Sequence, residues 1–247
     1  MVIINKPQRK NDIPPGWGED QLSNFINNAI QNSYATFHNL KAEYDLLKNI
    51  NNIFEVLSDN LSNTPALIPA LFFNRAHAAF LHAVRLVISG AIYETFVLLR
   101  NCIEHSIYAF YVNKDKDRQE IWLRRHDNAE CKSKMKKEFR NVKIFDYLKI
   151  NDEMLYIIVL YLYETTIDFG AHPNPAALFS VISQTTEENI HTFHSSYLVD
   201  DVTSLKFGLR VTAQVGICSL KVFQKIYMER FNILGLSQQI DILSKGL

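Results

Sequence analysis

The segment from Ile92 to Val112 constrains the fold more than any other part of the chain, because it is long and apolar on most sides. At about 100° per residue, apolar side chains that recur at every third or fourth position share one face of a helix. In this segment those side chains are Ile92, Phe96, Leu99, Ile103, Ile107 and Phe110. The spacing therefore predicts a central helix that packs into the core along this stripe.

The remaining faces of the predicted helix mix polar and apolar groups. The polar ones are Glu94, Arg100, Asn101, Glu104, His105 and Tyr108. Arg100 and Glu104 are four residues apart, so their side chains can pair along the helix. An ionisable group in apolar surroundings needs a partner or changes its protonation state. We therefore take Arg100, Asn101, Glu104 and His105 as candidate site residues.

Three apolar or aromatic residues of the same segment, Val97, Tyr108 and Val112, lie away from the core stripe. A single layer of neighbouring helices would leave them uncovered. We therefore expect a homodimer that buries part of the central helix.

Charge and cysteine usage exclude several classes of protein. The 247 residues carry no formal net charge and the pI is about 7.1, so binding to nucleic acid or membrane needs a local patch. Cys102, Cys131 and Cys218 are too dispersed for a disulfide framework or a CxxC metal site. The N-terminal residues lack a hydrophobic signal core, and the run Met154–Tyr163 is too short to span a bilayer. We expect a cytoplasmic protein with reduced cysteines, no membrane partner, no metal and no cofactor.

Elsewhere the pattern is mostly helical. Residues 1–18 hold three prolines and no periodicity, which predicts an irregular N-terminal arm. Residues 19–61 have helical spacing and form one long helix or two joined end to end. A further helix begins at Pro65 or Pro69 and ends at Ser89-Gly90.

The second half of the chain predicts two more long helices. Asn151 or Asp152 can cap the first of them, which ends at Gly170. This helix is apolar almost all round, so we expect it to be buried. Alternating residues near 178–196 predict a small β-hairpin. Asp200 or Asp201 can cap a last long helix to about residue 232, followed by a short helical tail. The expected fold is all-α: residues 19–247 form a single-domain helical bundle of about six helices with this hairpin.

Residues 114–143 differ from the rest in composition, with eleven Lys or Arg against six Asp or Glu. A basic stripe with an occasional aromatic residue can lie along a phosphate backbone. The alternative, which is the commoner outcome for a run of charge, is an exposed amphipathic helix whose charges only solvate it.

The motif Arg100-Asn-Cys-Ile-Glu-His105 resembles the R-x(4–6)-H signature of the HEPN superfamily, helical proteins that are often metal-independent ribonucleases. The resemblance implies an endoribonuclease of toxin, defence or stress-response type, with RNA as substrate and an antitoxin or regulatory protein as partner. His105 would move the proton of the 2′-hydroxyl or of the leaving group, Arg100 would stabilise charge on the phosphorane, and Asn101 would orient the phosphate. The resemblance also implies a homodimer whose two motifs meet at a cleft.

A second part of the resemblance covers roughly residues 68–180, the HEPN-like core. There the segment with Arg100 and Glu104 is followed by the turn Asp168-Phe-Gly-Ala-His172-Pro-Asn174, similar to a HEPN-like group with an Arg-x3-Glu pair and a downstream His-Pro turn. His172 could then face Arg100 and Glu104, which makes Glu104 and His172 auxiliary site residues. Two simpler interpretations remain open: His172 caps its helix, and Arg100 with Glu104 is an ion pair that sets helix register.

The alternative function belongs to another class: a non-catalytic, dimeric helical interaction or ligand-sensing module. In such a module the polar cluster fixes packing or binds a small ligand. Residues five apart on a straight helix point about 140° away from each other. The two functions are therefore best separated by whether Arg100 and His105 converge on one accessible site.

Overall fold

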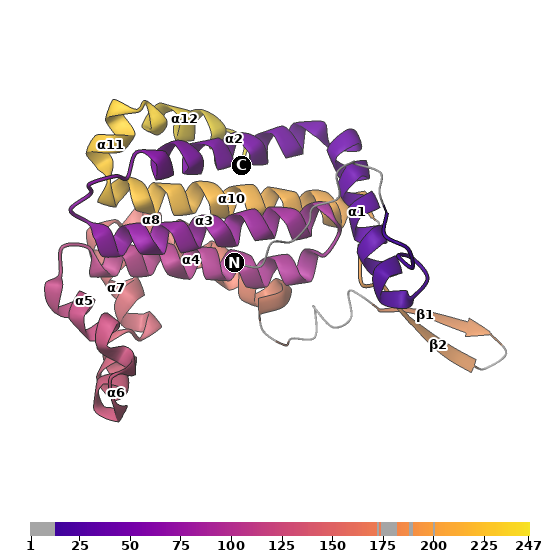
Figure 1. Cartoon of the computed structure of the whole chain (residues 1–247), viewed down its shortest axis with the longest axis horizontal. Helices are drawn as coiled ribbons and strands as arrows, with labels where there is room; N and C mark the ends of the chain where they lie inside the picture. Colours follow the sequence, from indigo (N-terminus) through magenta and orange to yellow (C-terminus); the bar gives the residue numbers. More distant parts are fainter. Residues whose placement is uncertain (1–12, 172, 174–181, 188–189, 200) are drawn as a thin grey trace.

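The computed structural model describes residues 13–171, 173, 182–187, 190–199 and 201–247. This part of the chain forms a helical bundle, which confirms the predicted all-α class (Figure 1). It contains eleven α-helices, so the expected number of about six is wrong. The additional helices arise because the expected long segments are interrupted by short breaks, at Leu40, between 113 and 140, and after Ile226.

Four helices that run side by side form the centre of the bundle: α2 (Lys41–Asp59), α3 (Leu67–Ile88), α4 (Ile92–Val112) and α10 (Val202–Ile226) (Figure 1). Their largest fully buried side chains are Phe54, Phe73, Phe80, Phe96 and Phe223. Gly216 allows α10 to approach α3 closely, because a Cβ atom there would lie 2.6 Å from the Phe80 ring. Each fully buried large apolar side chain contributes about 2 kcal/mol to this packing.

The N-terminal segment forms two helices, which decides between the two alternatives for residues 19–61. Asp20 caps α1 (Gln21–Asn39) by accepting hydrogen bonds from the Leu22 and Ser23 amides. The chain leaves helical geometry at Leu40, and α1 turns away from α2 (Figure 1). Residues 13–18 are non-helical, whereas residues 1–12 of the predicted arm lie outside the described residues.

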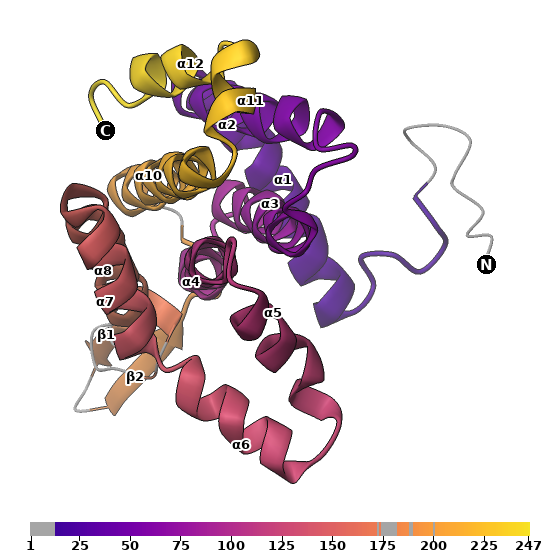
Figure 2. The same cartoon turned by 90° about the vertical axis from the view of Figure 1, so that its left-hand side faces the viewer.

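The basic segment is not one helix. It consists of α5 (Lys116–Leu123), a short 3-10 turn (Arg124–His126) and α6 (Ala129–Glu138), followed by α7 (Asn141–Asn151). We call the part from Lys116 to Glu138 the basic arm. It projects from one end of the bundle below α4 (Figure 2). The Tyr111 hydroxyl donates to Glu138 over 2.8 Å, which attaches the end of the arm to α4.

Helix α8 (Glu153–Thr166) begins at the predicted Asp152 cap, but it is not buried all round. Met154 is 70% exposed and Tyr161 is 67% exposed, so this prediction is wrong. The reason is position: α8 lies on the outside of the bundle and packs with one side on α4, α7 and α10 (Figure 2). After α8, the turn Ile167–Ala171 contains Gly170 with a φ of 152°, which agrees with the predicted helix stop.

The remaining elements are two strands between α8 and α10 and two short helices after α10. Strands β1 (Ile182–Glu187) and β2 (Ile190–Ser195) pair antiparallel within the segment for which the sequence predicts a hairpin, part of which lies outside the described residues. Helices α11 (Met228–Ile233) and α12 (Leu236–Leu243) form the tail, and α12 packs against α2 (Figure 1). Within the described ranges, no helix combines the length and apolar character needed to cross a membrane.

Candidate functional site

Arg100 and Glu104 form the predicted ion pair on one flank of α4. The Arg100 Nε and Glu104 Oε1 atoms are 2.9 Å apart, and the side chains are 19% and 33% exposed. The Arg100 Nη2 atom also donates to the Tyr163 hydroxyl of α8 over 2.6 Å. The guanidinium carbon lies 4.8 Å from the centre of the Tyr163 ring, a cation–π contact. The pair is therefore part of a larger network that joins α4 to α8.

The Tyr163 hydroxyl is the centre of this network. It accepts hydrogen bonds from Arg100 and, over 2.8 Å, from Asn141 at the start of α7. It donates to Glu104 over 3.3 Å. A phenol has one donor and two acceptor positions, so all three are used. We call Arg100, Glu104, Asn141 and Tyr163 the arginine network.

Burial and charge shift the pKa values of this network in a consistent way. Burial is the largest single effect and lowers the pKa of Arg100, but the hydrogen bonds to Glu104 and Tyr163 and their charges together outweigh it, so the pKa is raised. Burial, followed by the negative charge of Glu104, raises the pKa of Tyr163. At neutral pH the network therefore holds a cationic Arg100 and an un-ionised Tyr163.

His105 lies on the other flank of α4. Its Nδ1 atom is 2.7 Å from the Asn101 carbonyl oxygen, and its ring centre is 6.0 Å from that of Phe72 on α3. A carbonyl only accepts hydrogen bonds, so Nδ1 carries the proton and donates, which leaves Nε2 as an acceptor in the neutral ring. Burial lowers the pKa of His105, and the positive charge of Arg75 lowers it further. His105 lies off the core stripe that the sequence predicts, and it is half-buried against Phe72.

The structure does not direct Arg100 and His105 to the same partners: Arg100 binds Tyr163 of α8, whereas His105 contacts Phe72 of α3. Glu104 lies between the two flanks, since its charge raises the pKa values of both Tyr163 and His105. The half-buried Asn101 contributes its backbone oxygen to His105. The sequence thus located the polar cluster and the divergence of Arg100 and His105 around the helix, and the structure adds the partners of each flank.

Two residues of α4 that were expected to be uncovered, Val112 and Tyr108, are covered in the structure. Val112 is fully buried, and Tyr108 packs between Phe72 and Phe139, with ring centres 6.1 and 5.5 Å away. The expectation that both lie uncovered is therefore wrong: Val112 belongs to the buried core, and Phe72 of α3 and Phe139, which follows the basic arm, cover Tyr108. Val97 is 50% exposed, as expected.

His172 lies outside the described residues. The turn before it packs against the first turn of α4, because a Cβ atom on Gly170 would lie 2.4 Å from the Tyr93 carbonyl oxygen. Tyr93 precedes Arg100 by seven residues, which is roughly 10 Å along a helix. Gly170 thus holds this turn near the beginning of α4 rather than beside the arginine network.

No family model, curated protein or solved structure matches this chain. The site must therefore be interpreted from its own chemistry.

Sequence reasoning missed Tyr163 and Asn141. Tyr163 is one of several tyrosines in an apolar run, and nothing in its spacing separates it from the exposed Tyr161. Asn141 follows Arg140 at a helix start, where its residue type predicts no particular partner. Both acquire their roles through contacts made when α7 and α8 pack on α4.

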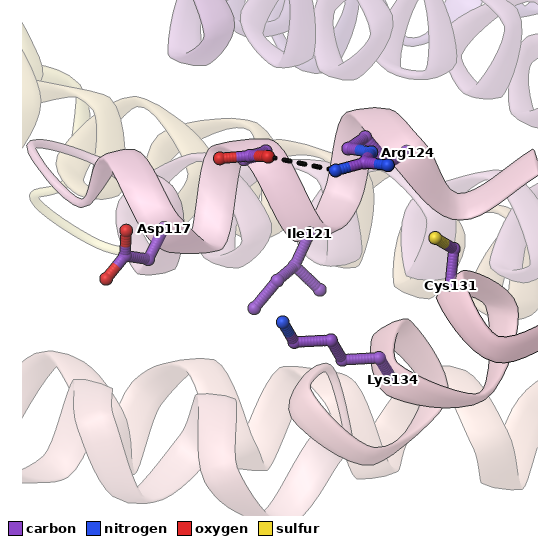
Figure 3. Close-up of a pocket in the computed structure, with 6 residues that line it drawn as sticks. Asp117, Ile121, Arg124, Cys131 and Lys134 are labelled. Carbon is purple, nitrogen blue, oxygen red and sulfur yellow. Dashed lines mark hydrogen bonds and ion pairs between the residues drawn. The ribbon is translucent and has the colours of Figure 1, made fainter. Parts of the chain in front are cut away.

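Two cavities lie away from the arginine network. One of about 410 Å³ lies between α5 and α6, lined by Asp117, Glu120, Ile121, Arg124, Cys131 and Lys134 (Figure 3). Another, of about 400 Å³, lies between α8, α10 and the C-terminal tail, and is lined mainly by apolar side chains that include Ile157, Ile158 and Tyr161. In the described part of the chain, no group of three or more His, Cys, Asp or Glu residues could hold a metal ion.

Proposed function

We propose that this chain is a non-catalytic, dimeric helical interaction module, in which the arginine network fixes the position of the helix that carries the interface. The observation that carries this proposal is the saturation of the Tyr163 hydroxyl by Arg100, Glu104 and Asn141. Arg100 commits Nε to Glu104 and Nη2 to Tyr163, so a bidentate contact with a substrate phosphate through these two atoms would break both bonds and take the cation from the half-buried carboxylate. That loss is costly, so the geometry favours a structural role over a catalytic one.

The interface of this module is the outer face of α8 and α10. On α8 the exposed apolar residues Met154, Ile157, Ile158 and Tyr161 are spaced so that they share one side of the helix. The neighbouring side of α10 carries Arg210, Gln214, Ile217 and Lys221, which are spaced three or four residues apart. Contiguous apolar surface of this kind marks an interaction site.

The occupant of this face is a second copy of the chain. A two-fold interface uses the same patch twice and must therefore be complementary to itself. The α8 side is acidic at its exposed end, with Glu164 and Asp168, whereas the α10 side is basic, with Arg210 and Lys221. No ion pair within the described residues uses these four side chains. A two-fold rotation that lays α8 on α10 of the partner pairs opposite charges around an apolar centre.

Light scattering of the full chain tests this proposal. Wild type should have the mass of a dimer, and Ile157→Asp should have the mass of a monomer. The melting temperature of the variant should stay close to that of wild type at a concentration low enough for the dimer to dissociate. The control is Ile233→Asp on α11, because Ile157 and Ile233 are both exposed isoleucines, at 52% and 77%. It should remain dimeric. A monomeric wild type at high concentration would contradict the proposal.

A second function is favoured by one observation on the other flank of α4. His105 donates from Nδ1 to Asn101 and is neutral at pH 7, so its Nε2 atom has the form of a general base. With this residue as base, the chain would be a HEPN-like metal-independent endoribonuclease of toxin, defence or stress-response type. Its partners would be RNA and an antitoxin or regulatory protein.

Incubation of the chain with an RNA pool in excess chelator separates the two functions. The interaction module leaves the RNA intact. The ribonuclease produces 2′,3′-cyclic phosphate ends, because the substrate's own hydroxyl is the nucleophile, and loses its activity in His105→Gln. Cleavage that survives His105→Gln would exclude His105 as the base.

A further inference from the structure

The basic arm and its flanking residues concentrate unpaired positive charge. Of the eleven Lys or Arg in residues 114–143, the described ion pairs use three, Arg118, Arg124 and Lys143. Of the six acidic residues in that segment, the same ion pairs use four, Asp115, Glu120, Asp127 and Glu138. Eight cations and two carboxylates therefore stay outside these pairs, in a chain with no net charge.

Half of these cations lie on α6. Lys132, Lys134, Lys136 and Lys137 are exposed, and the exposed Arg140 lies two residues after the end of the helix. Lys132 and Lys136 are spaced four residues apart on α6, which places their side chains on one side of the helix with a rise of about 6 Å between them. Met135 and Phe139, the apolar residues of this stretch, are buried.

The arm is attached rigidly at its base. Arg118 lies between two aromatic rings, 4.0 Å from the Tyr111 centre and 4.8 Å from the Tyr147 centre. Glu138 accepts from Tyr111 and, over 2.6 Å, from Lys143. These contacts use the Glu138 carboxylate internally, and the arm places α6 away from the central helices of the bundle (Figure 2).

The exposed lysines of α6 fit a phosphate backbone better than a lipid surface. A helix that binds a membrane inserts apolar side chains between its basic ones. Among the residues of α6, none is an exposed large apolar side chain. A nucleic-acid strand needs no such insertion, because repeated phosphates pair with repeated cations and release counterions.

We infer that the exposed lysines of α6, Lys132, Lys134, Lys136 and Lys137, together with Arg140, bind the phosphodiester backbone of nucleic acid without regard to sequence. This goes beyond the interaction module, since neither the arginine network nor the α8 face contributes to it. Four lysine contacts to a single strand predict a slope of roughly −3 in the logarithm of affinity against the logarithm of salt concentration. Affinity should then fall roughly fiftyfold between 50 and 200 mM salt.

Fluorescence anisotropy of the full chain with labelled 20-nucleotide RNA and DNA of the same sequence tests the inference. Both probes should bind at 50 mM salt with the expected slope, because the backbone chemistry is shared; binding of only one of them would overturn the inference as stated. The variant that changes Lys132, Lys134, Lys136 and Lys137 to Gln should lose most of the affinity and bring the slope close to zero. Replacing the same four with Arg should preserve both.

The matched control removes four exposed charges elsewhere: Lys48, Arg85, Lys149 and Lys245, each changed to Gln. It should bind as wild type does. Circular dichroism and melting temperature of each variant separate lost binding from lost folding, and the exposed lysines predict unchanged values. Equal binding by the α6 variant and the control would overturn the inference. So would binding to phosphatidylserine vesicles without binding to either nucleic acid.

Discussion

The two polar flanks of α4 are both half-buried, yet they are held in different ways. On one flank Arg100 and Glu104 are tied to α7 and α8 through Tyr163, whose donor and acceptor positions are all used. On the other, His105 has one hydrogen bond to its own helix and packs on the Phe72 ring. A flank whose central hydroxyl has every hydrogen-bonding position filled resists rearrangement around a ligand. A flank with one acceptor atom left over retains chemical capacity.

This difference predicts unequal losses of stability, the largest at Arg100. Arg100→Ala removes hydrogen bonds to Glu104 and Tyr163 and leaves the half-buried carboxylate without its cation. We expect a loss of about 2 kcal/mol in the free energy of unfolding, below the value for a fully buried pair because both side chains are partly exposed. Urea denaturation measures it. Arg85→Ala, an exposed arginine of α3, is the control and should change stability by less than about 0.5 kcal/mol. If Arg100→Ala and Arg85→Ala lowered the free energy of unfolding equally, the distinction between the flanks would be wrong.

The next largest effect is expected at Tyr163. Tyr163→Phe keeps the ring on Arg100 and Phe145 but deletes the hydroxyl that joins three helices. The loss should be about 1 kcal/mol, since Arg100, Glu104 and Asn141 each lose one partner but can reach water. Tyr34→Phe, at an exposed tyrosine of α1 outside the proposed interface, should be neutral in the same denaturation experiment. A neutral Tyr163→Phe would mean that the network does not hold α8.

The smallest effect is a pH dependence that belongs to the His105 flank. Burial lowers the folded-state pKa of His105 and of His77, which stacks on Phe54, below the ordinary value of 6.5. The neutral ring is therefore favoured in the fold. Its contribution is fully present above about pH 6.5 and is lost as the pH falls through that value toward the folded pKa. The free energy of unfolding should thus rise between pH 5 and pH 7.

Replacing these histidines measures their share of that rise. His105→Gln should flatten the dependence in part, and a double variant with His77→Gln should flatten it further, as followed by denaturation at each pH. The exposed His82→Gln variant is the matched control. A slope unchanged in the double variant would show that other groups titrate in this range.

The sequence by itself determined most of the helices, because hydrophobic periodicity and capping are local. The central helix has the predicted bounds Ile92–Val112, and Asp152 and Asp201 cap the helices that follow them. The Arg100–Glu104 pair was equally predictable, since a spacing of four on one helix brings the two side chains together. Even these local rules did not give the number of helices, because short breaks such as Leu40 depend on how neighbours pack.

Only the tertiary structure decided which helix covers which face. The run of α8 is apolar almost all round, yet some of its residues are exposed because the helix lies on the outside of the bundle. Periodicity along the sequence cannot distinguish a helix that is surrounded by others from one that packs on a single layer. The same packing brought Tyr163 to Arg100 across 63 positions of sequence and turned His105 toward Phe72 of α3. These contacts depend on the distances between helix axes, which no spacing along one helix encodes.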